Sequence, residues 1–294
     1  MAILLCGMLV RMSAVMTAMR RGVWLLSLVA PRAAGRVAFE LFRHPLRRVA
    51  VRPHEVDTHR AATVEAVHVG GKAIVIYAWG DGVRPVLFLH GWESRGSRVA
   101  PLVQPLLDAG FSPISFDAPG HGDAASRGNS IPFYGAVAAY VDERWGPLAG
   151  IVGHSFGVPA GFYAVKSGVR AGCLVGVAGP CRFDYAADEF ARRMRLLPSV
   201  RADVRRRVEK ALLPLTDVWS ALSADDRPEL VSVPILLLHD DADPTVALAQ
   251  ARRTQAAYGE QAELVVTSGL GHSRILADPE VVRRIVAFVA ASEP

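Results

Sequence analysis

The residues with the clearest chemical potential form the pentapeptide Gly153-His154-Ser155-Phe156-Gly157. It follows an apolar segment that predicts a strand and precedes a segment that predicts a helix. A G-x-S-x-G sequence at such a junction folds as a tight turn, so small residues must flank the serine. The turn lifts the serine oxygen above the sheet to a helix N-terminus, where the helix dipole and free N–H groups favour an anion. Ser155 is therefore the predicted nucleophile.

A serine hydroxyl needs a base that takes its proton. Of the nine histidines, His272 is the best placed, because it lies in a loop between the last predicted strand and the last helix. For the other histidines near predicted strand ends we expect loop packing, backbone hydrogen bonds or contacts that support the site: His90, His121, His154 and His239.

An imidazole base needs a carboxylate that fixes its tautomer and stabilises its charge. Asp240, Asp241 and Asp243 follow a predicted strand. Asp243 is favoured because Pro244 is expected to open the next helix, which would leave Asp243 exposed at the turn. We expect Asp240 and Asp241 to be solvated or capping residues, and Asp184 is an alternative acid.

A developing oxyanion needs hydrogen-bond donors. The N–H of Phe156 directly follows the nucleophile, and the N–H of Trp92 is the second predicted donor, since Gly91 lets the backbone approach closely. Trp92, Phe183 and Tyr185 are predicted to line the substrate pocket. Core packing is the alternative for Phe183 and Tyr185.

These residues resemble the α/β-hydrolase family. The similarity covers roughly residues 60–294 and rests on the order Ser155, Asp243, His272, on His90-Gly91-Trp92, and on the loop 116–122 with the sequence Phe-Asp-Ala-Pro-Gly-His-Gly. It implies an eight-stranded, mostly parallel sheet, a cap after the sixth strand, and acyl hydrolysis without a cofactor. The chain is most similar to small bacterial esterases with a single H-G-x loop. A serine nucleophile argues against epoxide hydrolases and haloalkane dehalogenases, which use aspartate.

The loop 117–122 within that motif is expected to form a turn. Asp and Pro set the bend, and the glycines permit positive φ. Asp117 is therefore predicted to be structural and not catalytic.

The elements that must position these residues alternate between strands and helices. Gly70-Gly71 between two β-prone runs predicts a hairpin. Continuous apolar strands between helices predict an α/β fold whose parallel sheet is covered on both faces. The predicted strands are 62–69, 72–78, 85–89, 112–116, 148–153, 171–178, 234–239 and 262–267, and the predicted helices are 97–109, 131–144, 156–166, 247–258 and 279–291.

Two further segments complete the predicted domain organisation. Residues 1–60 form an apolar and basic helical leader, and residues 61–294 form the hydrolase domain. Within that domain a helical insertion at about 181–231 is expected to cap the carboxyl ends of the strands, where α/β sheets bind their ligands.

Charge is concentrated in the leader. The formal net charge is +5, and residues 1–60 hold ten arginines, no lysine and three acidic residues. The rest of the chain holds 23 basic and 25 acidic residues, without a basic stripe interleaved with aromatics, so nucleic acid is not an expected partner. Three cysteines form neither a paired framework nor a metal-ligand spacing, and no metal site is predicted.

The leader is broken by Arg11 and by Arg20-Arg21 into apolar stretches too short to cross a bilayer cleanly. Packing on the catalytic domain is the first expectation for it. A poorly formed signal peptide and association of residues 1–50 with a membrane surface are the alternatives. We therefore expect a cytoplasmic protein, and the alternative is a protein that associates with a membrane through the leader.

The sequence predicts a serine hydrolase that cleaves carboxylic esters through an acyl-enzyme at Ser155, with a small acyl compound as substrate. The same residues could serve a thioesterase, an amidase, a C–C bond hydrolase or an acyltransferase, because fold and triad do not name the substrate. A non-catalytic binding protein is the remaining alternative. The sequence makes no prediction of oligomeric state.

Overall fold

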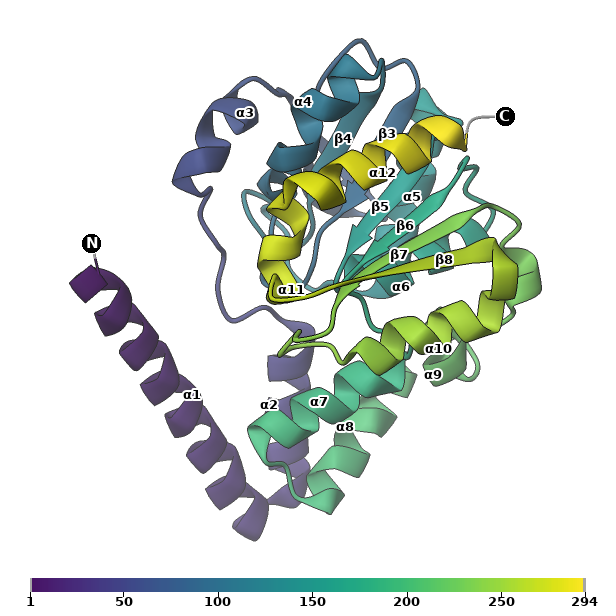
Figure 1. Ribbon diagram of the computed structural model, residues 1–294. Coiled ribbons are helices and arrows are strands. Elements are labelled where there is room, and N and C mark those ends of the chain that lie inside the picture. The colour runs from purple at the N-terminus through teal and green to yellow at the C-terminus, as the bar shows by residue number, and fades with distance from the viewer. Residues whose placement is uncertain (1, 293–294) are drawn as a thin grey trace. The chain divides into compact units, whose positions relative to one another are not determined.

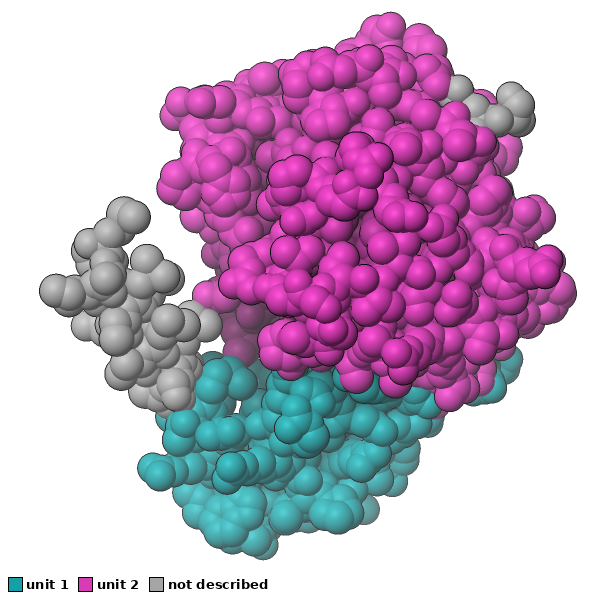
Figure 2. Space-filling model, viewed as in Figure 1, with its two compact units in different colours: residues 1–43, 184–218 teal, residues 44–183, 219–294 magenta. Residues whose placement is uncertain are grey.

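The computed structural model describes the backbone of residues 2–292 and the side chains of residues 16–292. The chain forms two compact units (Figure 2). The helical unit contains residues 1–43 and 184–218, and the sheet unit contains residues 44–183 and 219–294. Packing thus groups the start of the chain with the central insertion. Their bounds differ from those expected from the sequence, which placed the leader at 1–60 and the insertion at about 181–231.

The sheet unit is built on one eight-stranded sheet with the order β1-β2-β4-β3-β5-β6-β7-β8 (Figure 1). Strands β3 to β8 are mutually parallel, and β2 is antiparallel to both of its neighbours. The predicted α/β fold with a mostly parallel sheet is confirmed. The strands are β1 (Thr63–Val69), β2 (Lys72–Ala78), β3 (Pro85–Leu89), β4 (Ser112–Asp117), β5 (Gly150–His154), β6 (Leu174–Val177), β7 (Ile235–Asp240) and β8 (Ala262–Thr267).

The predicted hairpin joins β1 to β2. Val69 pairs with Lys72, and the two residues between them, Gly70 and Gly71, have φ of 53° and 74°. A two-residue turn with positive φ at both positions matches the twist of the flanking strands, and glycine adopts it without steric cost.

Helices cover both faces of the sheet, as predicted (Figure 1). Phe88 and Val152 point into the core that α4 and α12 close on one face. Ile151, the neighbour of Val152, points to the other face, where its side chain lies against Gly161 of α6. The helices of this unit are η1 (Pro53–Glu55), α3 (Val56–Arg60), η2 (Gly96–Val99), α4 (Ala100–Asp108), α5 (Ile131–Trp145), α6 (Gly157–Lys166), η3 (Pro228–Leu230), α10 (Leu248–Tyr258), η4 (Gly259–Gln261), α11 (Gly271–Arg274), η5 (Ile275–Ala277) and α12 (Pro279–Ala291). Helix α9 (Val218–Ala221) also belongs here, although it begins one residue before the unit's second segment.

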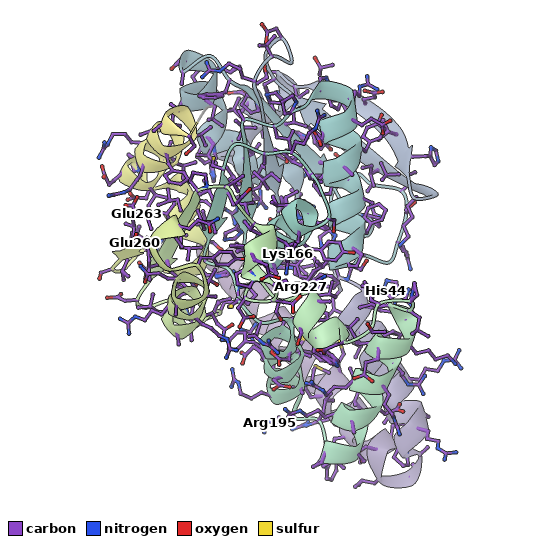
Figure 3. The ribbon with its side chains drawn as sticks, turned by 90° about the vertical axis from the view of Figure 1, so that its right-hand side faces the viewer. His44, Lys166, Arg195, Arg227, Glu260 and Glu263 are labelled. Carbon is purple, nitrogen blue, oxygen red and sulfur yellow. The ribbon has the colours of Figure 1, made fainter. Side chains whose placement is uncertain are left out.

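A half-buried lysine closes the end of α6. Lys166 Nζ donates to the carbonyl oxygens of Ser223 and Asp226, at 2.8 and 3.1 Å, and the side chain lies beside the segment that leads to Arg227 (Figure 3). Burial lowers the pKa of Lys166 to about 8. The ammonium thus links α6 to the segment that returns the chain from the insertion to β7.

The helical unit contains α1 (Ala2–Val29), α2 (Pro31–Arg43), α7 (Phe183–Met194) and α8 (Pro198–Ala211), although α7 begins one residue before the unit's second segment. Helix α2 packs against α8, where Gly35 faces Asp203. Asp203 accepts hydrogen bonds from Arg206 and Arg207 at 2.8 and 2.6 Å, which hold its carboxylate in place. The side chain of Arg11, which interrupts the apolar leader, lies outside the described residues.

Within the part of the chain that the structure describes, no helix combines the length and the apolar character that crossing a membrane requires.

The contact between α2 and α8 can be tested at Gly35. A Cβ built there would lie 2.0 Å from Asp203 Oδ2 and 2.8 Å from Asp203 Cβ, so Gly35→Ala must separate the two helices. We expect hydrogen exchange of the backbone amides in α2 and α8 to accelerate roughly tenfold or more, the size of an overpacking cost. Gly22→Ala is the matched control, because nothing lies within 4 Å of a Cβ there. Alanine also favours a helix, so the control should exchange no faster. Equal exchange in the two variants would contradict this packing.

Candidate active site

Ser155 occupies a strained turn between β5 and α6. Its φ is 54°, which is unusual for a residue with a side chain. A Cβ on Gly153 would lie 2.5 Å from the carbonyl oxygen of Gly157, and a Cβ on Gly157 would lie 2.0 Å from that of Leu89. Only glycine fits at these two positions, which is the reason for the predicted small flanking residues.

The structure brings together the three residues that the sequence singled out. His272 Nε2 lies 3.0 Å from Ser155 Oγ, and His272 Nδ1 lies 2.8 Å from Asp243 Oδ2. Ser155 follows β5, Asp243 follows β7 and His272 follows β8, so parallel strands deliver all three to one edge of the sheet. With its Nδ1–H donated to Asp243, the imidazole can accept the serine proton at Nε2.

Asp243 differs in its surroundings from the sequence-based expectation. Its side chain is fully buried, whereas exposure at the turn was expected. Pro244 does not open the next helix either, since α10 begins at Leu248. The expectation was wrong because residues 244–247 form a bend closed on the carboxylate, and a proline in a bend and a proline at a helix start have the same sequence context.

The bend stabilises the ionised form of Asp243. Its Oδ1 accepts hydrogen bonds from the backbone N–H groups of Thr245 and Val246, at 2.7 and 3.0 Å. Burial alone would raise the pKa of Asp243, but the hydrogen bonds from His272 and from these two N–H groups outweigh it and lower the pKa below its usual value. The carboxylate therefore stays charged beside the imidazole.

Asp240 was expected to be a solvated or a capping residue; solvation was wrong, whereas the hydrogen bond that it accepts from Leu270, at the start of α11, agrees with capping. It is fully buried, and it accepts hydrogen bonds from Thr267 Oγ1 at 2.9 Å and from the backbone N–H of Leu270 at 2.8 Å. These bonds fasten the segment after β8 to the end of β7. The neighbouring Asp241 accepts from Ser268 Oγ at 2.6 Å and is exposed, as expected.

His272 itself lies in the short helix α11, where a loop was predicted. His154 supports this helix, since its Nε2 lies 2.9 Å from the carbonyl oxygen of His272. Burial, followed by the proximity of His272, lowers the pKa of His154 to about 3, so its ring is neutral and Nε2–H donates to the carbonyl. The backbone hydrogen bond expected for His154 thus holds the backbone of the predicted base.

The loop after β3 lies against the serine turn. A Cβ built on Gly91 would be 3.1 Å from Ser155 Cβ, and the rings of Trp92 and Phe156 meet edge to face at 5.6 Å between centroids. The two residues predicted to donate to an oxyanion are therefore neighbours in space. Their donor role stays a prediction.

Two buried histidines hold this loop by its backbone. His90 Nε2 accepts from the N–H of Ala118 at 3.2 Å, while its Nδ1 lies 2.8 Å from the carbonyl oxygen of Gly91. His121 Nε2 accepts from the N–H of Glu93 at 3.2 Å. These bonds tie the loops after β3 and β4 to each other and agree with the structural role expected for His90.

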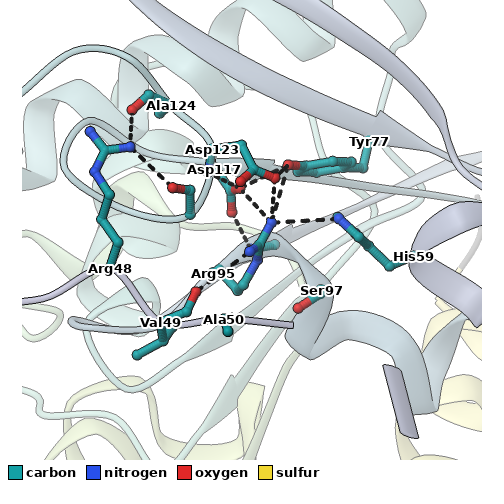
Figure 4. Close-up of polar contacts among 12 residues, drawn as sticks. Arg48, Val49, Ala50, His59, Tyr77, Arg95, Ser97, Asp117, Asp123 and Ala124 are labelled. Atoms are coloured by element: carbon teal, nitrogen blue, oxygen red, sulfur yellow. Dashed lines mark hydrogen bonds and ion pairs between the residues drawn. The ribbon is translucent and has the colours of Figure 1, made fainter. Parts of the chain in front are cut away.

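An ion-pair cluster, in which Arg95 and Asp117 are buried and Asp123 is exposed, anchors the same loops (Figure 4). Asp117 accepts from the N–H groups of Gly96 and Asp123, at 2.7 and 2.8 Å, and from Tyr77 Oη at 2.8 Å. Arg95 Nη2 lies 3.2 Å from Asp117 and 2.6 Å from Asp123. The prediction that Asp117 is structural is confirmed. Sequence reasoning missed Arg95, Tyr77 and Asp123, because no spacing reveals a side-chain network that joins three separate segments.

The predicted pocket residues have different outcomes. The ring of Phe183 is buried and stacks on Trp219, with centroids 5.3 Å apart, which matches the core-packing alternative. Tyr185 and Asp184 belong to the helical unit. A substrate contact of Tyr185 stays a prediction. Asp184 was the alternative acid, but His272 already has a carboxylate partner in Asp243.

A sequence model described as the alpha/beta hydrolase family matches residues 86–285, more than half of the chain.

The chain is also similar to individual proteins. It is 23% identical over 265 residues to a non-heme haloperoxidase of Rhodococcus erythropolis, a match that covers 74% of this chain and 96% of that protein. It is 33% identical over 100 residues to the dihydrolipoyllysine-residue acetyltransferase component of the acetoin cleaving system of Cupriavidus necator, so the match spans 33% of this chain and only 26% of that one.

Solved structures share the fold. An esterase of Pyrococcus furiosus superposes with a TM-score of 0.63 at 16% identity, over 83% of this chain and 98% of that one. A monoacylglycerol lipase of Paleococcus ferrophilus superposes with a TM-score of 0.59 at 21% identity, over 75% and 99%.

The buried histidines predict a loss of stability in acid. Burial lowers the pKa of His121 to about 4 and that of His154 to about 3, from 6.5, so unfolding takes up a proton at each. Below pH 6.5 each should therefore reduce the free energy of unfolding by about 1.4 kcal/mol per pH unit, until the pH reaches the folded pKa. Urea unfolding at pH values from about 7.5 to about 5 measures this slope.

His121→Gln should reduce the slope by the contribution of about one proton, which is about 1.4 kcal/mol per pH unit. Glutamine can still accept the hydrogen bond from the N–H of Glu93, but it does not titrate. His68→Gln on the exposed side of β1 is the control and should leave the slope unchanged. An identical slope in all three proteins would contradict the role of burial.

Proposed function

The chain belongs to the α/β-hydrolase family, and on this premise we propose that it is a serine hydrolase that cleaves carboxylic esters or closely related acyl bonds. The observation that supports this most strongly is the continuous hydrogen-bonded line from Ser155 Oγ through the imidazole of His272 to the buried carboxylate of Asp243, at 3.0 and 2.8 Å. Such a line activates a hydroxyl that is otherwise a weak nucleophile.

The reaction begins at the serine. Ser155 Oγ attacks the carbonyl carbon of the ester while His272 Nε2 takes the hydroxyl proton, and the carbonyl electron pair moves to oxygen. When the tetrahedral intermediate collapses, the bond to the leaving alcohol breaks and His272 gives it the proton. The acyl group is then an ester of Ser155, and Asp243 remains ionised throughout.

Water completes the turnover. His272 removes a proton from a water molecule that attacks the acyl carbon, and the second tetrahedral intermediate releases the carboxylic acid as the proton returns to Ser155 Oγ. The N–H groups of Phe156 and Trp92 donate to the oxyanion in both steps. Apart from the water and the substrate, the groups in this cycle are side chains and backbone N–H groups of the chain.

The acyl bond is proposed to be an ester. Esterases and lipases are among the proteins that share the fold, and so is a thioesterase domain. A panel of p-nitrophenyl esters, thioesters and anilides separates these classes, because all of them acylate the same serine and differ only in the leaving group.

The nucleophile can be tested with a fluorophosphonate probe. Ser155→Ala should abolish labelling and reduce p-nitrophenyl ester hydrolysis by about 10⁶, because only this hydroxyl receives activation from the imidazole. Ser167→Ala, an exposed serine after the end of α6, is the matched control and should react like the unaltered protein. Labelling that persists in Ser155→Ala would refute the assignment, and failure of the unaltered protein with every probe would favour a non-catalytic role.

The acid can be tested separately. Asp243→Asn should lower kcat by about 10⁴ with the fold intact, because an amide stabilises the wrong imidazole tautomer. Asp184→Asn and the exposed Asp241→Asn are controls that should retain activity. Circular dichroism checks the fold of each variant. If only Asp184→Asn lost activity, the acid would be Asp184.

A further inference from the structure

The second half of α1 presents large apolar side chains to solvent. Trp24 is 46% exposed, Leu25 and Leu28 are each 57% exposed, and Val29 is 82% exposed. Positions 24, 25 and 28 lie on one face of a helix, because side chains three and four residues apart are neighbours there. Val23, on another face, is only 4% exposed. Helix α1 therefore has a packed face and an exposed apolar face in the same turns.

Exposed arginines flank this apolar segment in the sequence. Arg21 is exposed and precedes Trp24 and Leu25 by one helical turn, and Arg32 and Arg36 are exposed in the first turns of α2. Residues 16–43 contain five arginines, no lysine and a single acidic residue, Glu40. The rest of the chain after residue 60 is close to neutral, with 23 basic and 25 acidic residues. The positive charge is thus concentrated where the apolar side chains are exposed.

We propose that this α1–α2 surface, consisting of Arg21, Trp24, Leu25, Leu28, Val29, Arg32 and Arg36, binds an anionic lipid bilayer. The aliphatic side chains enter the boundary between headgroups and acyl chains, and the indole of Trp24 lies at headgroup depth with its N–H toward water. The guanidinium groups contact lipid phosphates in bidentate geometry. This inference concerns the helical unit alone and is independent of the proposed hydrolase chemistry.

Charge complementarity favours a lipid surface over a second copy of the chain. In a twofold dimer the same patch would face itself, so the arginines would oppose arginines without enough acidic partners. An anionic bilayer presents the opposite charge over its whole area and also accepts apolar side chains directly beneath it. Binding to such a bilayer satisfies both the positive charge and the exposed apolar side chains of the surface.

Sedimentation with vesicles tests the proposal on the full chain. We expect binding to vesicles of phosphatidylcholine with about one third phosphatidylglycerol, at least about tenfold stronger than to phosphatidylcholine alone. Raising the salt from about 0.05 M to about 0.5 M should weaken binding at least about tenfold, since charges near the surface are then screened.

Two double variants separate the apolar and the charged contributions. Leu25→Gln with Leu28→Gln should weaken binding at least about tenfold, and Arg32→Gln with Arg36→Gln roughly tenfold. The matched controls are Val64→Gln with Val83→Gln, at sites 58% and 60% exposed in the sheet unit, and Arg127→Gln with Arg252→Gln, which are exposed arginines there. Both controls should bind as the unaltered protein does. Circular dichroism should show equal helix content in all variants.

Three results would overturn the proposal. One is the absence of vesicle binding at low salt, and another is equal binding to neutral and anionic vesicles. The third is concentration-dependent dimerisation without vesicle binding, lost in Leu25→Gln with Leu28→Gln, which would assign the surface to a second copy.

Discussion

The close approach of α6 to β3 fixes the position of the serine. The Cα of Gly157 packs so near the carbonyl oxygen of Leu89 that a methyl group would lie 2.0 Å from it. With the first turn of α6 held there, the chain between β5 and the helix must bend sharply, and Ser155 takes a φ of 54°. The strain of such a backbone is tolerated because the buried strands on both sides over-determine it. The hydroxyl is thereby held where His272 can reach it.

Polar contacts inside the sheet unit then hold the loops that surround this turn. Asp117 and Arg95 join the loops after β4 and β3, and His90 and His121 join the same loops through backbone groups. A buried polar group costs free energy unless it is bonded, so a network of this kind holds its loops in one arrangement. Because burial keeps His90 and His121 neutral, with pKa values below their ordinary value, the arrangement is most stable at neutral and higher pH.

The sequence was most informative where a pattern is local. Continuous apolar runs predicted all eight strands, and Pro85–Leu89 matched residue by residue, whereas the strands predicted at 148–153 and 171–178 begin two and three residues later in the structure. The glycines around Ser155 predicted the turn. Features that depend on contacts distant in sequence were not predictable in this way. The burial of Asp240 and Asp243 depends on the segments that fold over them, and the pairing of α2 with α8 joins residues far apart in the chain. No periodicity encodes such contacts.

Asp243 shows why a buried carboxylate suits this position better than the exposed one that was expected. Its Oδ1 is occupied by two backbone N–H groups, which leaves Oδ2 to face His272 at 2.8 Å, with His239 Nε2 farther away at 3.7 Å. The Nε2–H of His239 donates to the carbonyl oxygen of Val246, 2.9 Å away. This nitrogen therefore cannot accept the Nδ1–H of His272, which is left to Asp243. An exposed carboxylate would divide its hydrogen bonds with water and rotate among them. Burial removes that competition, and the fixed backbone donors compensate the charge that burial would otherwise disfavour.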